Sequence, residues 1–384
     1  MAGRRPDRTL ACVVGGVEVV RALGAAGIRS VVVGPPDAPA RLSRFAAAGI
    51  DLGPGALVDA LVAHARAQAE PPVLLFDSDA VLLEVSRARD RLAGHFRLLL
   101  PAPELVEDLV DKGRFQDLAE RLALDVPEAR RVATDRADAS DLVGLGFPLI
   151  LKPVPYRDER WDALGERAKA LYVEDAAELR RLWPRLAEAG LELLAQQIVP
   201  GSEAEILSYH VYVDRAGDIA GEFTGRKIRT YPARFGVSSA LVTTRDEQVS
   251  GQGRDVVRRL GIVGPAKLDF KRDPDGRLAL LEVNPRLTLW AQAGAVAGVN
   301  LPAIAHADLT GAPRPAAGPA RAGVRWIHPR LDLAAAREVG LSLPRWATFA
   351  LRCETNQALA WNDPWEAWRR YGPPRRSRSR AVAG

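Results

Sequence analysis

The chain has 384 residues, 47% hydrophobic and 26% charged, which is typical of a globular protein with two or three domains. Its two cysteines, Cys12 and Cys353, exclude a disulfide framework and a zinc spacing, and no apolar run is long enough to span a membrane. The net charge of +5 comes from basic residues that alternate with acids, so we expect no nucleic-acid partner. We expect a cytoplasmic protein and leave a homodimer open.

The first hundred residues alternate short apolar runs with helical patterns. The predicted strands are Leu10–Val14, Ser30–Val33 and Val73–Phe76, and Val17–Ala26 predicts a helix. This alternation favours a parallel sheet, in which ligands bind beyond the carboxyl ends of the strands. Gly15-Gly16 and Asp77-Ser78-Asp79 should lie there. Gly15-Gly16 lacks the full dinucleotide fingerprint, so taken alone it indicates a tight turn.

The next segment begins after Pro101–Pro103, which interrupts the alternation. Glu104–Leu124 predicts one helix, and Phe147–Pro153 predicts a buried strand that ends at Lys152. Further along the chain, Ala176–Ala189 predicts a helix that Pro184 should kink or break, and Glu192–Val199 predicts a strand.

Two antiparallel strand pairs follow, each joined by a turn rich in Asp, Gly or Pro. The predicted pairs are Glu205–Val213 with Ile219–Thr224, and Ala266–Arg272 with Arg277–Val283; Asp246–Leu260 predicts a helix between them. After Ala312 the chain is rich in Ala, Pro and Gly, and the final Arg375–Arg380 run predicts a disordered tail.

The second strand pair carries the most informative residues. With a turn centred on Pro274-Asp275, Asp269 faces Leu280 and lies diagonal to Glu282. Asp269, Glu282 and Asn284 then share one face, while the expected core face holds Leu268, Phe270, Leu281 and Val283. Two carboxylates and an amide oxygen suit Mg²⁺, which prefers oxygen ligands. The alternative is a solvated face of an amphipathic hairpin.

Several motifs occur in an order that resembles the ATP-grasp family over roughly residues 10–310. They are Asp111-Lys112, Phe147–Pro153, Gln196–Glu203, Asp269–Asp273 and Leu281–Arg286. The chain is more closely similar to the predicted carboligase and D-aspartate-ligase-like branch, through Thr224–Pro232, Phe235-Gly236 and Trp361–Trp368. The resemblance implies a mixed α/β and α+β fold. It divides into an N-terminal parallel-sheet (pre-ATP-grasp) domain at 1–103, two ATP-grasp lobes at 104–190 and 191–312 with antiparallel sheets, and a C-terminal extension at 313–384.

The resemblance also implies the cofactors, ATP and Mg²⁺, with Mn²⁺ as a substitute. It assigns the ATP phosphates to Lys112 and Lys152, adenine to Gln197 and Val199, and the ribose to Glu203 or else Glu205. It assigns the metal to Asp269, Glu282 and Asn284. The simpler interpretations are a surface lysine for Lys112 and an ordinary strand end for Gln197–Glu203. One departure from the family is the segment Val154–Ala168, whose only glycine is Gly165, so the cover of the phosphates stays open.

Three arginines complete the implied site. Arg286 would face the transferring phosphoryl group, and Arg226 and Arg229, with Lys227 between them, would bind a carboxylate or acyl phosphate. The alternative for Arg226–Arg229 is an exposed basic strand. His210 is given no catalytic role.

The implied activity is ATP-dependent ligation of a small-molecule carboxylate to an amine, or to a thiol, through an acyl phosphate. Two alternatives remain: a small-molecule kinase on the same site, and a non-catalytic nucleotide-binding scaffold.

Overall fold

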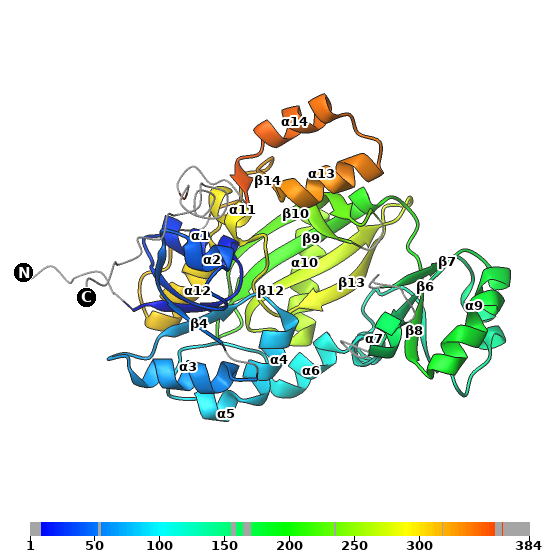
Figure 1. Cartoon of the computed structure of the whole chain (residues 1–384), viewed down its shortest axis with the longest axis horizontal. Helices are drawn as coiled ribbons and strands as arrows, with labels where there is room; N and C mark the ends of the chain where they lie inside the picture. Colours follow the sequence, from blue (N-terminus) through cyan, green and yellow to red (C-terminus); the bar gives the residue numbers. More distant parts are fainter. Residues whose placement is uncertain are drawn as a thin grey trace, which may run out of the picture.

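The computed structural model describes residues 9–52, 55–154, 159–163, 170–233, 236–316, 318–357 and 363. Three sheets organise this part of the chain, and Figure 1 shows the largest of them between the other two. Tyr156, Gly165, Phe235, Trp361 and the Arg375–Arg380 tail lie outside the described residues. The mixed α/β fold with a parallel N-terminal sheet and antiparallel sheets is confirmed.

The N-terminal sheet is parallel, as the sequence predicts, and its strand order is β3-β2-β1-β4. Its strands are β1 (Ala11–Val14), β2 (Ser30–Val33), β3 (Ala46–Ile50) and β4 (Val73–Phe76). The helices around it are α1 (Val17–Ala25), α2 (Pro39–Leu42), α3 (Leu57–Arg66), α4 (Asp79–Arg87) and α5 (Arg89–Leu92). Every residue of β1, β2 and β4 is buried, because helices cover both faces of a parallel sheet.

The predicted helix at Glu104–Leu124 is wrong as a single element. The structure has α6 (Pro103–Val110) and α7 (Lys112–Arg121), separated by Asp111. Asp111 has an extended backbone, and its carboxylate accepts a 2.8 Å hydrogen bond from the Arg114 amide, so it caps the second helix. This cap places Lys112 at the first position of α7.

A second sheet has the order β5-β8-β6-β7 and is antiparallel. Its strands are β5 (Ala129–Ala133), β6 (Leu149–Pro153), β7 (Leu171–Val173) and β8 (Glu192–Gln197), accompanied by α8 (Glu159–Ala163) and α9 (Ala176–Ala189). The helix α9 continues through Pro184, so the proline does not break it. Lys152 lies on β6, the strand between β8 and β7.

The largest sheet has seven strands in the order β13-β12-β9-β10-β11-β14-β15. They are β9 (Ile206–Val213), β10 (Ile219–Tyr231), β11 (Val237–Thr244), β12 (Gly264–Arg272), β13 (Leu278–Asn284), β14 (Arg325–Ile327) and β15 (Thr355–Asn356). Both predicted strand pairs are confirmed as antiparallel neighbours. The helix α10 (Glu247–Leu260) begins at Asp246, whose side chain caps it, and packs on β9.

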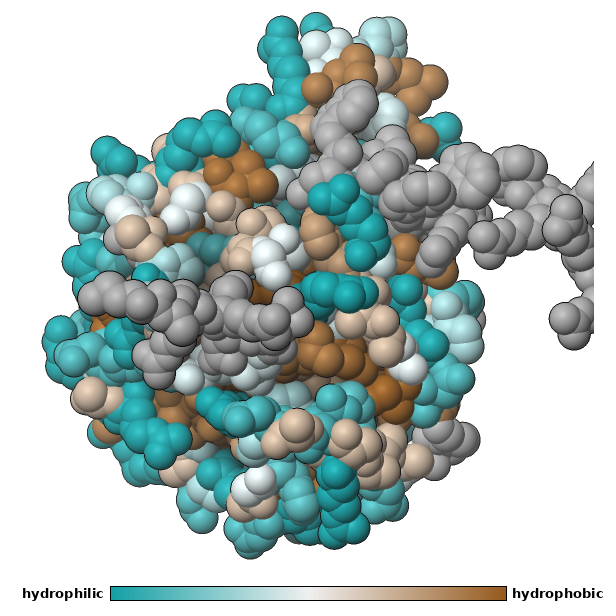
Figure 2. Space-filling model, turned by 90° about the vertical axis from the view of Figure 1, so that its left-hand side faces the viewer, coloured by the Kyte–Doolittle hydropathy of each residue, from teal (hydrophilic) through white to brown (hydrophobic). Residues whose placement is uncertain are grey.

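The remaining helices connect the largest sheet to its surroundings. They are α11 (Ala291–Val296), α12 (Leu301–Thr310), α13 (Pro329–Glu338) and α14 (Leu343–Leu351). Both α11 and α12 pack against α1, so one hydrophobic core joins the N-terminal sheet to the largest sheet. Figure 2 shows the face on the side of the N-terminal sheet, where hydrophilic residues surround smaller apolar areas. None of the described helices has the length and apolarity needed to cross a membrane.

Candidate active site

The hairpin β12–β13 brings Asp269 and Glu282 directly opposite each other, and Lys267 opposite Asn284. The predicted partner of Asp269, Leu280, is wrong. A β-bulge follows the Asp269–Glu282 pair, so Leu280 pairs with Phe270 instead. The bulge also corrects the predicted core face, because Leu280 is fully buried whereas Leu281 is only partly buried. The predicted proximity of the two carboxylates is confirmed by this register.

Asp269 lies at the centre of a buried charge cluster. Its side chain accepts hydrogen bonds from Ser208 Oγ at 2.5 Å and from Lys267 Nζ at 2.6 Å, and Lys227 Nζ lies 3.2 Å away. Burial alone would raise the pKa of this carboxyl, but Lys227 and Lys267 hold it well below its usual value. Asp269 is therefore ionised at neutral pH.

Glu282 and Asn284 extend this cluster toward solvent. Lys267 Nζ lies 3.4 Å from Glu282 Oε1, and Asn284 Nδ2 donates a 3.0 Å hydrogen bond to the same oxygen. The Glu282 side chain is 54% exposed, whereas that of Asp269 is 2% exposed. Burial would raise the pKa of Glu282, but Lys267 lowers it. Asp269 is thus the buried carboxylate of the pair, and Glu282 is the carboxylate that solvent can reach.

The donor set fits a hard divalent cation. Two facing carboxylates and one amide oxygen are the ligands that Mg²⁺ accepts, and it commonly takes the rest from water and phosphate. Lys267 Nζ lies within hydrogen-bonding or ion-pair reach of both carboxylates, so an ammonium group already lies between them. Asn284 would have to turn its amide to present Oδ1, which now accepts from Arg286. The described residues contain no group of three or more His, Cys, Asp or Glu side chains suited to a metal.

Lys152 lies on β6 of the second sheet, Lys112 begins α7, and the charge of Glu282 acts on Lys152. Lys152 Nζ donates a 2.7 Å hydrogen bond to Gln196 Oε1, and Lys112 Nζ donates one of 2.8 Å to the Pro153 carbonyl. Burial lowers the pKa of Lys152 to about 8, although Glu282 acts in the opposite direction and Lys112 adds to the lowering. The charges of Glu282 and Lys112 therefore both act on Lys152. A negatively charged group bound near Lys152 would stabilise its protonated form.

The residues predicted to bind adenine and ribose lie at the end of β8 and in the connection from β8 to β9. Gln197 donates from Nε2 to the Leu145 carbonyl at 2.5 Å, so its side chain is engaged within the second sheet. Val199 is partly buried, as are Glu203 and Glu205. Glu203 Oε1 lies 4.0 Å from the buried Lys271 Nζ, while Glu205 belongs to the same short 3₁₀ turn. Their assignment to adenine and ribose stays a prediction.

Arg286 connects the carboxylate cluster to the N-terminal sheet. Its guanidinium forms a two-pronged ion pair with Asp79, at 2.6 and 2.7 Å, and donates to the Asp77 carbonyl at 3.0 Å. The same side chain donates to Asn284 Oδ1 at 3.1 Å. The Arg286 guanidinium therefore connects the carboxyl edge of the N-terminal sheet, where ligands are predicted to bind, to the predicted metal ligands. In this structure its ion-pair partner is Asp79.

Arg229 has an internal partner in this structure, and its predicted binding of an anion stays a prediction. Its guanidinium pairs with the fully buried Asp332 of α13 at 2.8 and 2.6 Å and lies over the Phe349 ring. Through these contacts Arg229 connects α13 and α14 to β10. Arg226 is exposed, as the alternative of a basic strand expected.

Sequence reasoning missed Lys267 as part of the carboxylate cluster, and it placed Lys227 with the anion-binding arginines instead. The alternation of strand side chains could have found Lys267, because it lies two residues before Asp269 on the same face. No local signal pointed to Asp79 or Asp332 as arginine partners. His210 is buried and stacked on Phe223 at 4.5 Å, and burial lowers its pKa well below the usual value, so it is neutral.

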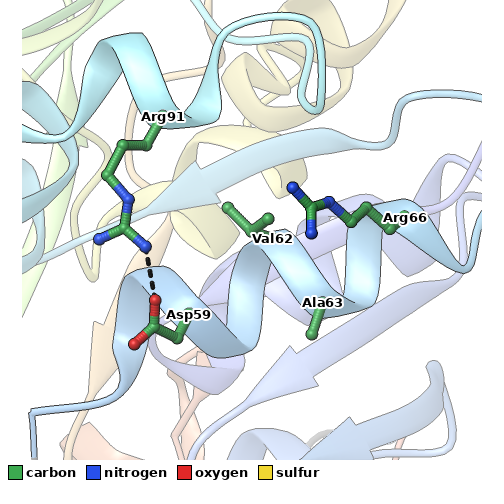
Figure 3. Close-up of a pocket in the computed structure, with 5 residues that line it drawn as sticks. All are labelled: Asp59, Val62, Ala63, Arg66 and Arg91. Carbon is green, nitrogen blue, oxygen red and sulfur yellow. Dashed lines mark hydrogen bonds and ion pairs between the residues drawn. The ribbon is translucent and has the colours of Figure 1, made fainter.

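A surface hollow on the N-terminal domain lies apart from this cluster. Figure 3 shows its lining residues on α3 and α5, with an ion pair of 2.5 Å between Asp59 and Arg91. Arg66, Val62 and Ala63 complete the lining. None of these residues contacts the carboxylate cluster, so the hollow is not the site described above.

No model of a protein family matches the chain. Among curated proteins, it is 27% identical over 236 residues to N5-carboxyaminoimidazole ribonucleotide synthase from Synechococcus elongatus, covering 60% of this chain and 55% of that protein. It is 26% identical over 185 residues to D-alanine–D-alanine ligase from Stutzerimonas stutzeri, covering 46% of this chain and 54% of that one. It is also 27% identical over 198 residues to the arginine-specific large chain of carbamoyl phosphate synthase from Halalkalibacterium halodurans, covering 50% and 18%. The chain thus matches less than two thirds of each relative.

Solved structures show the same fold over most of the chain. An ADP complex of N5-carboxyaminoimidazole ribonucleotide synthetase has a TM-score of 0.65 at 14% identity, covering 85% of this chain and 82% of that one. An L-amino acid ligase from Bacillus licheniformis has a TM-score of 0.58 at 15% identity, covering 80% and 75%. These solved structures share the fold of this chain, and the sequence relatives named above are ligases and synthases.

Proposed function

We propose that this protein is an ATP-dependent ligase that activates a small-molecule carboxylate as an acyl phosphate and joins it to an amine. The observation that carries the proposal is the facing pair Asp269 and Glu282 on one sheet, with Lys152 of another sheet close enough to respond to Glu282. The names of the relatives support ligation as the outcome, since they include ligases for D-alanine and for L-amino acids.

In the first step, an oxygen of the substrate carboxylate attacks the γ-phosphorus of ATP, and the bond from that phosphorus to the β-phosphate oxygen breaks. Lys152 and Lys112 would neutralise charge on the phosphates, which is the main task of a protein in phosphoryl transfer. Protonated Lys152 is favoured there because the incoming phosphates oppose the effect of its burial. In the second step, the neutral amine attacks the acyl carbon, the bond from that carbon to the phosphate oxygen breaks, and the nitrogen loses a proton to the departing phosphate or to water.

Asp269, Glu282 and Asn284 would hold Mg²⁺, which supplies Lewis-acid polarisation of the phosphate oxygens when bound. The chain's own lysines then keep this oxygen set in place. Lys227 and Lys267 fix Asp269 at 3.2 and 2.6 Å, so the buried carboxylate keeps one orientation while the exposed Glu282 adapts to the ligand. The same proposal includes the carboligase and D-aspartate-ligase-like branch and the division into domains that end at residues 103, 190 and 312.

The test is phosphate release from MgATP across pairs of candidate carboxylic acids and amines, with Glu282→Gln beside the natural chain. We expect turnover only when both substrates are present, and a loss of about 10³-fold in Glu282→Gln, because a lost metal ligand removes several kcal/mol of charge stabilisation. Unchanged turnover in Glu282→Gln would reject the metal assignment.

ADP formation that requires an acid or alcohol but no amine would favour the kinase alternative. Glu84→Gln is the matched control, because Glu84 is an exposed glutamate on α4. A folded Glu282→Gln protein, judged by its thermal unfolding, makes the comparison direct.

A further inference from the structure

Lys267 lies between the two carboxylates of the β12–β13 hairpin. Its Nζ is 2.6 Å from Asp269 Oδ2 and 3.4 Å from Glu282 Oε1. These carboxylates are the ones to which the proposed function assigns the metal, so the ammonium group and a divalent cation would compete for the same oxygens. The Lys267 side chain is only 11% exposed, so an ammonium group that left this position without a new partner would be costly.

The second lysine of the cluster is placed differently. Lys227 Nζ reaches the same Asp269 oxygen at 3.2 Å, and within the described residues no ion pair joins it to Glu282. Ser208 Oγ donates to the other Asp269 oxygen at 2.5 Å. Asp269 would therefore keep a cation and a hydrogen-bond donor if Lys267 moved away, and would not become an unpaired buried charge.

A buried nitrogen without a partner lies on the strand next to Lys267. His210 of β9 is directly opposite Lys267 of β12, so the two side chains project from the same face of the sheet. His210 is 2% exposed, and among the described residues no group forms a hydrogen bond with its Nε2. A buried polar nitrogen in this state is costly, so a hydrogen-bond donor that came close to it would be favoured.

The His210 ring is held in place by two aromatic side chains. It is stacked on Phe223 with an angle of 7° between the rings, and the centroid of the Trp290 ring lies 4.8 Å away. Burial, and to a smaller degree the charge of Lys267, lowers the pKa of His210 well below its usual value, so the ring is neutral. A neutral imidazole with its proton on Nδ1 accepts at Nε2, whereas an ammonium group only donates. The two side chains are therefore complementary hydrogen-bonding partners.

We propose that Lys267 is a displaceable internal cation, which lies between Asp269 and Glu282 in the free protein and donates to His210 Nε2 when a divalent cation binds the two carboxylates. His210 is then a positioning residue, because it acts through Lys267. This inference rests on the proposed function for the metal ligands. It adds how the free protein balances their charge and where that balancing charge goes.

The first test measures the binding of Mn²⁺ alone to the full chain, from the paramagnetic resonance signal of the free ion. Lys267→Met removes the competing ammonium group but keeps an unbranched side chain, so we expect it to bind Mn²⁺ at least about tenfold more tightly than the natural chain does. An equal or lower affinity would overturn the proposal. If Lys267→Met does not fold, Lys267→Gln keeps N–H donors for Asp269 without the charge and should show the same gain.

Lys271→Met is the matched control for this test. Lys271 is also a buried lysine on β12, but its ion-pair partner is Glu203, at 4.0 Å. We expect its Mn²⁺ affinity to stay within about threefold of that of the natural chain, because the ammonium that it loses does not lie between the metal ligands. A gain as large as that of Lys267→Met would mean that any loss of positive charge on this strand has the same effect, which contradicts a specific role of Lys267.

A double-mutant cycle isolates the contribution of His210. His210→Phe keeps a ring against Phe223 but removes the acceptor, so we expect Mn²⁺ to bind about fivefold more weakly than it binds the natural chain. In the Lys267→Met background the same change should have no effect, because the ammonium group that needs the acceptor is absent. An equal loss in both backgrounds would show a merely structural role of His210, and no loss in either would show no role.

The natural chain should also give a direct signature of the new hydrogen bond. The chain has five histidines, so nitrogen-15 NMR can follow each ring, with His210→Phe to assign the resonance of His210. We expect the His210 Nε2 resonance to move upfield when Mg²⁺ is added. His306 is the internal control, because its Nε2 already hydrogen-bonds to the Thr9 carbonyl at 2.8 Å, and its resonance should not move. A His210 resonance unchanged by Mg²⁺ would contradict the proposal.

Glu282→Gln separates the failure of this inference from the failure of the proposed function. If Glu282→Gln binds Mn²⁺ more weakly than the natural chain but Lys267→Met binds it equally, the displaceable lysine is wrong and the metal assignment stands. If Glu282→Gln binds Mn²⁺ as tightly as the natural chain, the ion lies elsewhere, and the metal assignment fails together with this inference. The absence of Mn²⁺ binding in every protein has the same meaning.

Discussion

The molecule contains two pairs of buried or half-buried carboxylates that differ in their cations. Asp269 has Lys227 and Lys267 within 3.2 Å, and its pKa is well below the usual value. Glu18 and Asp77 lie at a sheet edge where burial raises the pKa of both, although Arg21 lowers that of Glu18 and Arg286 lowers that of Asp77 by smaller amounts. The carboxyl group of Asp269 is therefore fixed as an anion, whereas burial favours the neutral form of the Glu18 carboxyl group.

This difference matters for what each pair can do. A carboxylate that is ionised in advance attracts a metal at neutral pH without a cost in protonation. A carboxylate near neutrality gains most from a ligand that brings both positive charge and N–H donors.

The largest expected effect comes from removing the charge of Asp269. Asp269→Asn leaves two lysines without their buried partner, so we expect the free energy of unfolding to fall by about 3–5 kcal/mol. Urea denaturation at pH 7 measures it. Glu282→Gln is the comparison, because Glu282 is half-exposed and should lose less than about 1 kcal/mol. Similar losses in both variants would mean that the lysines do not depend on Asp269.

The second effect is a pH dependence that separates the two pairs. Glu18 has an ordinary pKa of 4.5 when unfolded and about 7 when folded, so the folded state binds the extra proton between these values. Its contribution to stability is therefore complete below pH 4.5 and lost as pH rises through 7, by about 3 kcal/mol in total. Urea denaturation of Glu18→Gln and the natural chain across pH 4 to 8 should show the stability of the natural chain falling relative to the variant.

Asp269 should behave in the opposite way. Its folded pKa is depressed from 3.8, so its contribution is present above that value and is lost only as pH falls toward the folded pKa. Asp269→Asn should therefore differ from the natural chain by a constant amount between pH 5 and 8. A difference that changes across this range would contradict the assignment of a fixed anion.

The third effect concerns Lys152. Burial disfavours the charged form of this side chain, as burial also does for Glu18. Its pKa is lowered to about 8, so the free protein loses this charge as pH rises through 8. We expect the affinity for ATP, measured by calorimetry, to fall about tenfold by pH 9. Lys152→Arg stays charged and should show almost no such fall. A parallel decrease in both proteins would place the titrating group elsewhere.

The smallest effect is expected at Arg226, which lies beside Lys227 but is exposed. Arg226→Ala should change the free energy of unfolding by no more than about 0.5 kcal/mol, because it has no buried partner in the described structure. Arg229→Ala should cost several times more, since it leaves Asp332 buried and unpaired. Thermal unfolding of both variants decides the matter, and an equal cost would contradict the internal role of Arg229.

Local patterns predicted much of the fold because local chemistry decides it. The strands and turns of both hairpins, and the helix capped by Asp246, follow from apolar runs and turn residues. The break at Asp111 was missed because the apolar spacing continues through it, and only the cap to Arg114 ends the first helix. The bulge was missed because Leu280 and Leu281 are equally suited to the core, so the choice depends on the neighbouring strand.

The candidate site was predictable only where its residues lie near each other in sequence. Asp269 and Glu282 belong to one hairpin, and their proximity followed from a turn. The pairs Arg286–Asp79 and Arg229–Asp332 join residues 207 and 103 positions apart, and no pattern in one sequence encodes such contacts. For the same reason, the ion-pair partner of Arg229 could be found only from the structure.

The buried pair of Arg21 and Asp363 joins residues 342 positions apart. During synthesis, the helix α1 leaves the ribosome long before its carboxylate partner exists. Until Asp363 arrives, Arg21 would have to stay hydrated, because burying it alone is costly. The Arg21 side of the N-terminal sheet therefore gains its final partner only after residue 363 has been made.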